Sequence, residues 1–209
     1  MLGPETPQTL GPGGSRRPRV LAAYAASRDQ RKAARCGGIV FFEDEASFWL
    51  DGTLHRTWAR RGHQPRVDTY GQRKTAHVFG AIALNDATFV YRFASVFNSS
   101  TFLAFLKQLV RRAGGRKVFL IIDNAPHHNL SAEGKEWLAA NSASICLNRL
   151  PAYSPEFMPM EGVWKKTRAL TTHNRFYPSV AERNAALRRT FTRFQRKPRL
   201  IAAQVRRYA

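Results

Sequence analysis

Short apolar runs alternate with turn-forming residues along much of the chain and predict a series of strands. Two glycines open the segment 37–50, whose β-branched and aromatic residues are typical of a buried strand. The segment 77–94 holds two apolar runs separated by Asn-Asp at 85–86, a pattern that predicts a β-hairpin. Two later apolar runs, 117–123 and 144–150, predict further strands.

Helical spacing of apolar residues lies between and after these strands. The segment 98–115 begins with Ser and Thr, carries Phe and Leu along one face and ends in glycines, so it predicts an amphipathic helix. Shorter helices are predicted over 20–35 and 131–141. The chain from Pro159 onward is mostly helical, with a break at 177–178.

The order of these elements predicts the fold class. A first strand is followed by antiparallel excursions, one of them hairpin-like over 53–67, and then by strands that alternate with helices. Such an order is typical of an α/β protein with a mixed sheet flanked by helices.

Composition favours a globular intracellular protein. Apolar residues make up 44% of the 209 residues, enough for one domain with a real core. No apolar run approaches the roughly 18–20 residues of a membrane span, and the first 20 residues lack the apolar stretch of a secretory signal. Cys36 and Cys146 are therefore expected to be free thiols in the cytoplasm.

Charge narrows the function further. Lys and Arg total 34 against 14 Asp and Glu, which gives a net charge of +20. After Glu161 there are 13 basic residues and one acid, Glu182, whereas the segment 37–161 is nearly balanced. Because Lys and Arg displace counterions from phosphate backbones, this distribution favours a nucleic-acid-binding protein over a merely soluble surface.

Two acids stand at or near the ends of predicted strands. Asp44 is predicted to end the strand that begins at 37, and Asp123 ends the run "VFLIID". Acidic groups in such places are unfavourable unless they are paired or bind a cation. If the two strands are neighbours, both carboxylates lie at one sheet edge and suit Mg²⁺.

Glu161 is the third candidate acid. Pro159 suits the first position of a helix, so Glu161 is expected in its first turn, where the helix dipole favours the ionised form. The alternative is a capping-box glutamate, which Met158 at the cap position makes less favourable. Three other acids, Glu43, Glu45 and Glu156, stay open as substitutes on residue pattern alone.

Three motifs in order, "FFEDEASF", "IIDNAPHH" and "LPAYSPEFMPMEGVW", resemble the catalytic core of mariner-related bacterial insertion-sequence transposases. The resemblance covers about 38–169 and implies a ribonuclease-H-like fold. It also implies a catalytic triad of Asp44, Asp123 and Glu161 that binds two Mg²⁺ or Mn²⁺ ions, whereas Glu45 and Glu156 match residues that are not ligands.

The chain departs from the family pattern in three places. Met158 stands where the family has Asn, which removes an N-cap worth about 1 kcal/mol. Asp123 and Glu161 are 38 positions apart, slightly more than in close relatives. Finally, only about 36 residues precede the first strand, too few for the family's helix-turn-helix region. The expected division is therefore an N-terminal remnant or linker over 1–36, a catalytic domain over 37–175 and a basic helical tail over 176–209.

The resemblance implies a transposase catalytic subunit that nicks double-stranded DNA at transposon ends and transfers the strands to target DNA. It further implies a homodimer or larger synaptic complex, a separately encoded helix-turn-helix partner and a place in the bacterial cytoplasm at the nucleoid, with no membrane partner. Two alternatives are another ribonuclease-H-like nuclease, such as a ribonuclease H or a resolvase, and a non-catalytic DNA-binding remnant.

Several residues are candidates for contact with DNA. They are His127, His128, Lys165, Lys166, Arg168, Arg188 and Arg189. The two histidines are alternatively loop residues that stabilise their turn, and their spacing does not favour a zinc site. Tryptophans 49, 58 and 137 are expected to pack in the core or on a strand face rather than to stack on bases.

Overall fold

Five strands form a single mixed sheet in the computed structural model, which describes residues 28–71, 74–150 and 158–206. The strand order is β3-β2-β1-β4-β5. β1, β2 and β3 pair as an antiparallel meander, and β4 and β5 continue the sheet in parallel with β1. Their bounds are Ile39–Trp49 for β1, Thr75–Ala83 for β2, Phe89–Ala94 for β3, Val118–Ile122 for β4 and Ile145–Arg149 for β5.

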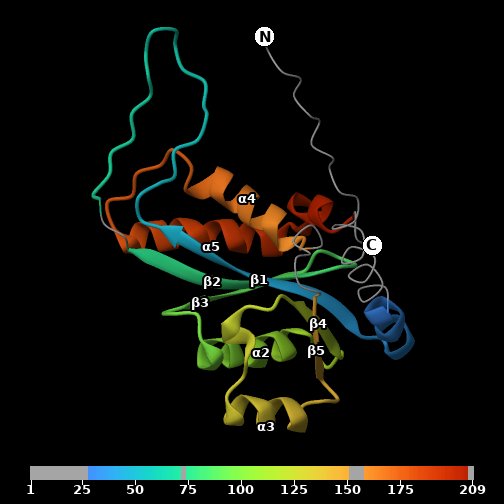
Figure 1. Cartoon of the computed structure of the whole chain (residues 1–209). Helices are drawn as coiled ribbons and strands as arrows, with labels where there is room; N and C mark the ends of the chain where they lie inside the picture. Colours follow the sequence, from blue (N-terminus) through green and yellow to red (C-terminus); the bar gives the residue numbers. More distant parts are fainter. Residues whose placement is uncertain (1–27, 72–73, 151–157, 207–209) are drawn as a thin grey trace, which may run out of the picture.

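Helices cover both faces of this sheet (Figure 1). α2 (Ser99–Arg112) and α3 (Ala132–Ala140) lie on one face, and α4 (Met160–Thr171) and α5 (Val180–Arg196) on the other. Residues 28–36 are also helical, and a short 3₁₀ helix, η1 (Pro126–His128), follows β4. Two further 3₁₀ turns, η3 (Pro198–Leu200) and η4 (Ala202–Gln204), come after α5. The predicted mixed sheet flanked by helices is confirmed.

Side chains of β1 alternate between the two faces, as in any strand. Phe41 belongs to the core under α2, whereas Phe42 and Phe48 belong to the core under α4 and α5. Continuing this alternation places Asp44 on the α4–α5 face. Glu43 and Glu45 consequently lie on the α2–α3 face.

α5 is part of this core. Leu187, Phe191 and Phe194 are fully buried, and the Phe191 ring meets Phe48 at 6.3 Å and Tyr91 at 4.7 Å between centroids. The domain boundary predicted between residues 175 and 176 would therefore separate α5 from the core to which it belongs. Of the expected N-terminal segment 1–36, residues 1–27 lie outside the described residues.

A long excursion joins β1 to β2 and projects from the body of the molecule (Figure 1). The hairpin-like pairing predicted over 53–67 is wrong, because no strand is assigned to the described residues between 50 and 74. At its base, Asn174 accepts from the His55 backbone N–H at 2.8 Å and donates to the His55 carbonyl at 2.8 Å. The packing expected of Trp49 and Trp58 is also wrong, since they are 55% and 101% exposed.

Arg183 of α5 binds the backbone at both ends of the excursion, near the end of β1 and just before β2. Its side chain is fully buried, and Nη1 donates to the carbonyls of Phe48 at 2.7 Å and Lys74 at 2.8 Å. Replacing Arg183 by Met should lower the free energy of unfolding by about 1–3 kcal/mol, because two backbone carbonyls, one of them in a buried hydrogen bond, lose a charged donor. Urea denaturation measures this, with Arg189→Met, exposed on the same helix, as the control. Equal stability of the two variants would contradict the assigned role.

Candidate active site

The sheet register brings Asp44 and Asp123 together. Phe42 of β1 pairs with Ile121 of β4, and the same parallel register continued by two residues places Asp44 beside Asp123. The expectation that Asp44 ends its strand is wrong, because β1 continues to Trp49. Asp44 reaches a sheet edge because the neighbouring β4 stops at Ile122, immediately before Asp123.

Asp44 lies under α4 and is held by Trp164. The indole Nε1 of Trp164 donates to Asp44 Oδ2 at 3.2 Å. Burial, together with the negative charges of Glu45 and Asp123, raises the pKa of Asp44 to about 7. The ionised form of this carboxyl group is thus unfavourable, and a nearby cation would stabilise it.

A glycine opposite Asp44 makes room for this contact. Gly80 of β2 pairs with Asp44, and a Cβ at this position would lie 2.7 Å from Trp164 Cζ2 and 2.8 Å from Met160 Cε. Both α4 side chains therefore need the bare backbone of Gly80 to approach the sheet.

Replacing Gly80 by Ala should displace Trp164 and break its bond to Asp44. We expect a loss of about 1–3 kcal/mol in the free energy of unfolding, as for an overpacked core. Denaturant unfolding measures the loss, and a red shift of tryptophan fluorescence would report the displaced ring. Ala at Gly62, where an added Cβ would meet no atom within 4 Å but φ is +81°, serves as a control for backbone strain without a clash. Unchanged stability of the Gly80 variant would contradict this packing.

Asp123 is held differently, with one oxygen occupied and one available. Oδ1 accepts from the Ala125 backbone N–H at 2.8 Å and lies 3.0 Å from His128 Nδ1. The hydrogen bond from His128 is the main reason that the pKa of Asp123 is lowered. Burial acts in the opposite direction, and the hydrogen bond from the Ala125 N–H lowers the pKa further. No hydrogen bond or ion pair from the described residues engages Oδ2, and the side chain is half-exposed.

Glu161 lies in the first turn of α4 and is exposed. The helix begins at Met160 with Pro159 as its cap residue, one position later than predicted. Within the described part of the chain, no hydrogen bond or ion pair joins Glu161 to either aspartate. Its link to the site is the helix itself, which carries Trp164 to Asp44 one turn further on.

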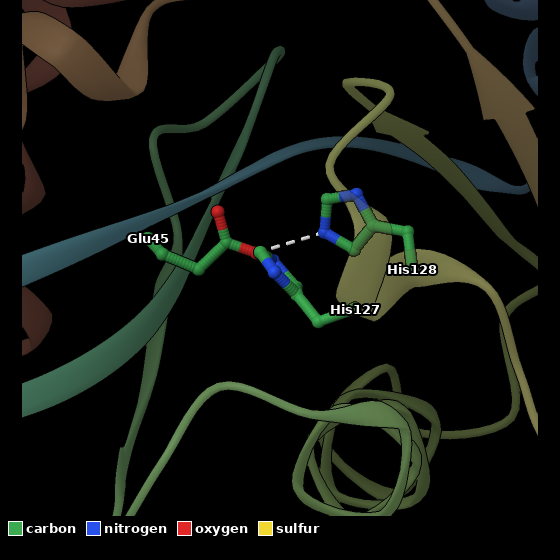
Figure 2. A group of neighbouring side chains, drawn as sticks. All are labelled: Glu45, His127 and His128. Carbon is green, nitrogen blue, oxygen red and sulfur yellow. Dashed lines mark hydrogen bonds and ion pairs between the residues drawn. The ribbon is translucent and has the colours of Figure 1, made fainter.

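On the opposite face of the sheet, Glu45 meets the two histidines of η1 (Figure 2), and Glu43 contacts His128. His127 Nε2 contacts Glu45 Oε1, and His128 Nε2 lies 2.8 Å from the same oxygen and 3.1 Å from Glu43 Oε2. The predicted contact of His128 with phosphate is therefore wrong, because its ring is fully buried. His127 is 16% exposed and also contacts Glu45. These contacts favour the alternative role for the histidines, that of residues that stabilise their own turn.

Burial and charge act against each other in this cluster. Burial by itself would lower the pKa of His128, but bonds to Asp123, Glu43 and Glu45 outweigh it and raise that pKa to about 12. Burial and the charge of Glu45 raise the pKa of Glu43 well above its ordinary value. From the sequence, the two glutamates are only alternatives to the candidate metal ligands, and the two histidines are candidates for contact with DNA. The sequence does not show that Glu43 and Glu45 meet the histidines on the face opposite Asp44.

The five candidate basic residues do not form one cluster. Lys166 Nζ contacts the carbonyl of Leu200, and Arg168 lies 5.4 Å from the Phe48 ring centroid. Arg168 also lines a hollow of about 360 Å³ between β1 and α4 that includes Glu45 and Thr172. Lys165, Arg188 and Arg189 are exposed. Burial lowers the pKa of Arg168, and the negative charge of Asp44 opposes this effect, which connects Arg168 electrostatically to the candidate site.

These residues fit a divalent cation. Hard cations take carboxylate oxygens, and Asp44 and Asp123 supply them at one edge of the sheet. Burial and the neighbouring negative charges of Glu45 and Asp123 raise the pKa of Asp44, so a cation bound at this edge would stabilise its ionised form.

Sequence and structure comparisons place the chain in a family. Residues 39–182 match the family described as DDE superfamily endonuclease, and the chain belongs to it. An insertion element IS630 protein of 39 kDa from Shigella sonnei is 31% identical over 138 residues. This match covers 65% of the chain but 39% of the relative, so the chain spans about two fifths of that protein's length.

Solved structures share the fold. The mariner Mos1 paired-end complex with Mg matches with a TM-score of 0.59 and 15% identity, over 98% of this chain and 64% of that one. A Mos1 strand transfer complex matches with a TM-score of 0.53 and 17% identity, over 97% and 66%. The fold is thus the predicted ribonuclease-H-like one. None of the described helices is long and apolar enough to cross a bilayer.

Proposed function

We propose that this chain is the catalytic part of an insertion-sequence transposase, which nicks DNA at the ends of its element and joins the freed ends to target DNA. The observation that supports this most is the position of Asp44 and Asp123, each two residues beyond the paired Phe42 and Ile121, within the region that matches the endonuclease family. The similarity to an IS630 protein and to Mos1 structures points to the same type of element.

Asp44, Asp123 and Glu161 would hold two divalent ions, Mg²⁺ or Mn²⁺. Such ions lower the pKa of an attacking water or 3′-hydroxyl and stabilise the leaving oxygen. Asp44 would bind in its ionised form while Trp164 fixes its orientation. Glu161 would complete the set from the first turn of α4, where the helix dipole favours its negative charge.

Basic side chains near and beyond this edge would hold the DNA backbone. Arg168 interacts electrostatically with Asp44, and Arg188 and Arg189 are exposed on α5, so together they would contact phosphates without reading sequence. Lys165 and Lys166 on α4 are further candidates, although Lys166 already contacts a backbone carbonyl. Double-stranded DNA, at transposon ends and at the target, is the proposed partner, at the bacterial nucleoid.

The reaction on two ends requires at least a homodimer. A helix-turn-helix protein from a neighbouring reading frame would recognise the element's ends. The test is to incubate the chain with labelled inverted-repeat duplex and Mg²⁺, with and without that upstream product. We expect nicks at the element ends and joined products with plasmid DNA. Binding without cleavage under both conditions would instead indicate a DNA-binding remnant, and cleavage restricted to RNA–DNA hybrids or junctions another nuclease.

A further inference from the structure

His128 links the candidate active site to the carboxylates behind it. Its Nδ1 lies 3.0 Å from Asp123 Oδ1, and its Nε2 lies 2.8 Å from Glu45 Oε1 and 3.1 Å from Glu43 Oε2. Each ring nitrogen therefore lies within hydrogen-bond distance of a carboxylate oxygen, an acceptor to which a ring N–H can donate. The proposed function uses Asp123 but assigns nothing to the histidine or to the two glutamates.

The His128 ring has little freedom to turn. It is fully buried, and its centroid lies 4.6 Å from that of Phe102 on α2. Its backbone is fixed as well, since its N–H donates to the Ala125 carbonyl at 3.1 Å and its own carbonyl accepts from Arg149 Nη2 at 3.2 Å. A donor held this firmly can fix the rotamer of the side chain that accepts from it.

The hydrogen bond with His128 helps to orient the carboxylate of Asp123. Its Oδ1 is shared by His128 and the Ala125 N–H, so the carboxylate plane is set by two donors at once. Its Oδ2 has no hydrogen bond or ion pair with the described residues and is therefore available to a cation. A carboxylate prepared in this way binds a cation without first giving up rotamer entropy.

We propose that His128 is a positioning residue for Asp123 and that Glu43 and Glu45 hold it in place from the opposite face of the sheet. The arrangement sets how strongly the Asp44–Asp123 pair binds a divalent cation. This inference rests on the proposed function only in taking these aspartates as cation ligands, so its test measures cation binding without DNA.

The test compares His128→Asn with His128→Gln. The amide nitrogen of Asn can occupy the place of Nδ1 and donate to Asp123, whereas that of Gln corresponds to Nε2 and faces the glutamates. Mn²⁺ affinity is measured by calorimetric titration of the full chain, and thermal unfolding in chelator records stability separately. We expect the Gln variant to bind Mn²⁺ about 10–100-fold more weakly, as for loss of a group that orients a ligand, and the Asn variant to stay within about threefold of the original protein.

His127→Asn is the matched control, since His127 also contacts Glu45 but does not touch Asp123. Its Mn²⁺ affinity should change by less than about threefold. Equal affinities of the Asn and Gln variants at position 128, or no Mn²⁺ binding by the original protein, would overturn the proposal. Loss of a bound Mn²⁺ in His127→Asn would also overturn it, because Glu45, His127 and His128 would then be cation ligands themselves. Failure of the original protein to cut DNA both with and without the upstream product, together with the predicted Mn²⁺ affinities, would refute the transposase function and leave this inference standing.

Discussion

Replacing Asp123 by Asn should lower Mg²⁺-dependent DNA cleavage by about a thousandfold, which corresponds to about 4 kcal/mol of lost transition-state stabilisation. The amide keeps the shape of the side chain and can still accept from the Ala125 N–H and His128 through one oxygen. It removes the negative charge that the proposed cation requires. DNA affinity should change little, because phosphate binding depends on basic residues elsewhere.

Cleavage of labelled inverted-repeat duplex measures the first effect, and fluorescence anisotropy of the same duplex measures the second. Asp68→Asn, at an exposed position in the excursion, is the control that should cleave normally. Glu161→Gln in the same assay tests the third carboxylate and should match the Asp123 variant. Full cleavage by Asp123→Asn would remove this residue from the proposed triad.

Replacing Asp44 by Asn should stabilise the folded protein by about 2–4 kcal/mol at pH 8 when a chelator removes divalent ions. In the folded protein, burial, Glu45 and Asp123 raise the pKa of Asp44 from its ordinary 3.8 to about 7. An uncharged amide avoids this destabilised anion, and its oxygen can still accept from Trp164. A site that binds cations thereby lowers the stability of the cation-free protein.

The sign of the effect follows from proton binding. Between about pH 4 and pH 7 the unfolded carboxyl is ionised while the folded one is still protonated, so raising the pH through this range favours unfolding. The destabilisation is absent below about pH 4 and complete above about pH 7. Asp44→Asn should therefore gain stability at pH 8 and gain almost none at pH 4.

Urea denaturation at the two pH values, with chelator present, measures these differences in the free energy of unfolding. Adding Mg²⁺ at pH 8 should stabilise the original protein and reduce the gap between it and the variant. Asp68→Asn is again the control and should show no gain at either pH. A gain for Asp44→Asn that was the same at pH 4 and pH 8 would contradict the raised pKa of Asp44.

The strands and helices were predictable because their signals are local. Apolar runs bounded by glycines and turn residues correspond to β1 through β5, and Phe and Leu at helical spacing in 98–115 correspond to α2. The position of Asp123 was predictable for the same reason, since the run before it is short, wholly apolar and followed by Asn-Ala-Pro.

The place of Asp44 was not predictable in the same way. A charged residue within an apolar run looks like the end of a strand, but β1 continues because its acids find partners in Trp164 and in the η1 histidines. Such partners are more than 80 residues away in sequence, so no local pattern contains them. The same holds for His128, whose burial depends on the packing of α2 against η1.

Charge alone did not predict that the C-terminal helix α5 is part of the core. The many arginines after residue 176 predict a tail that binds DNA, whereas Leu187, Phe191 and Phe194 lie at helical spacing and are buried in the core. A helix with one apolar face and one basic face can complete a core and present charge to a partner at once. Trp58 is the opposite case, since a large aromatic ring was expected to pack and is fully exposed.

Three consecutive acids on β1 do not share one pocket, because the pleat of the strand sends Glu43 and Glu45 to one side and Asp44 to the other. A single residue inserted ahead of Glu43 would exchange the two compartments, turning a glutamate toward Trp164 and the aspartate toward the histidines. The phase of this one strand thus decides which acid lies beside Trp164 and which acids lie beside the histidines, so a change of chain length here would relocate all three at once.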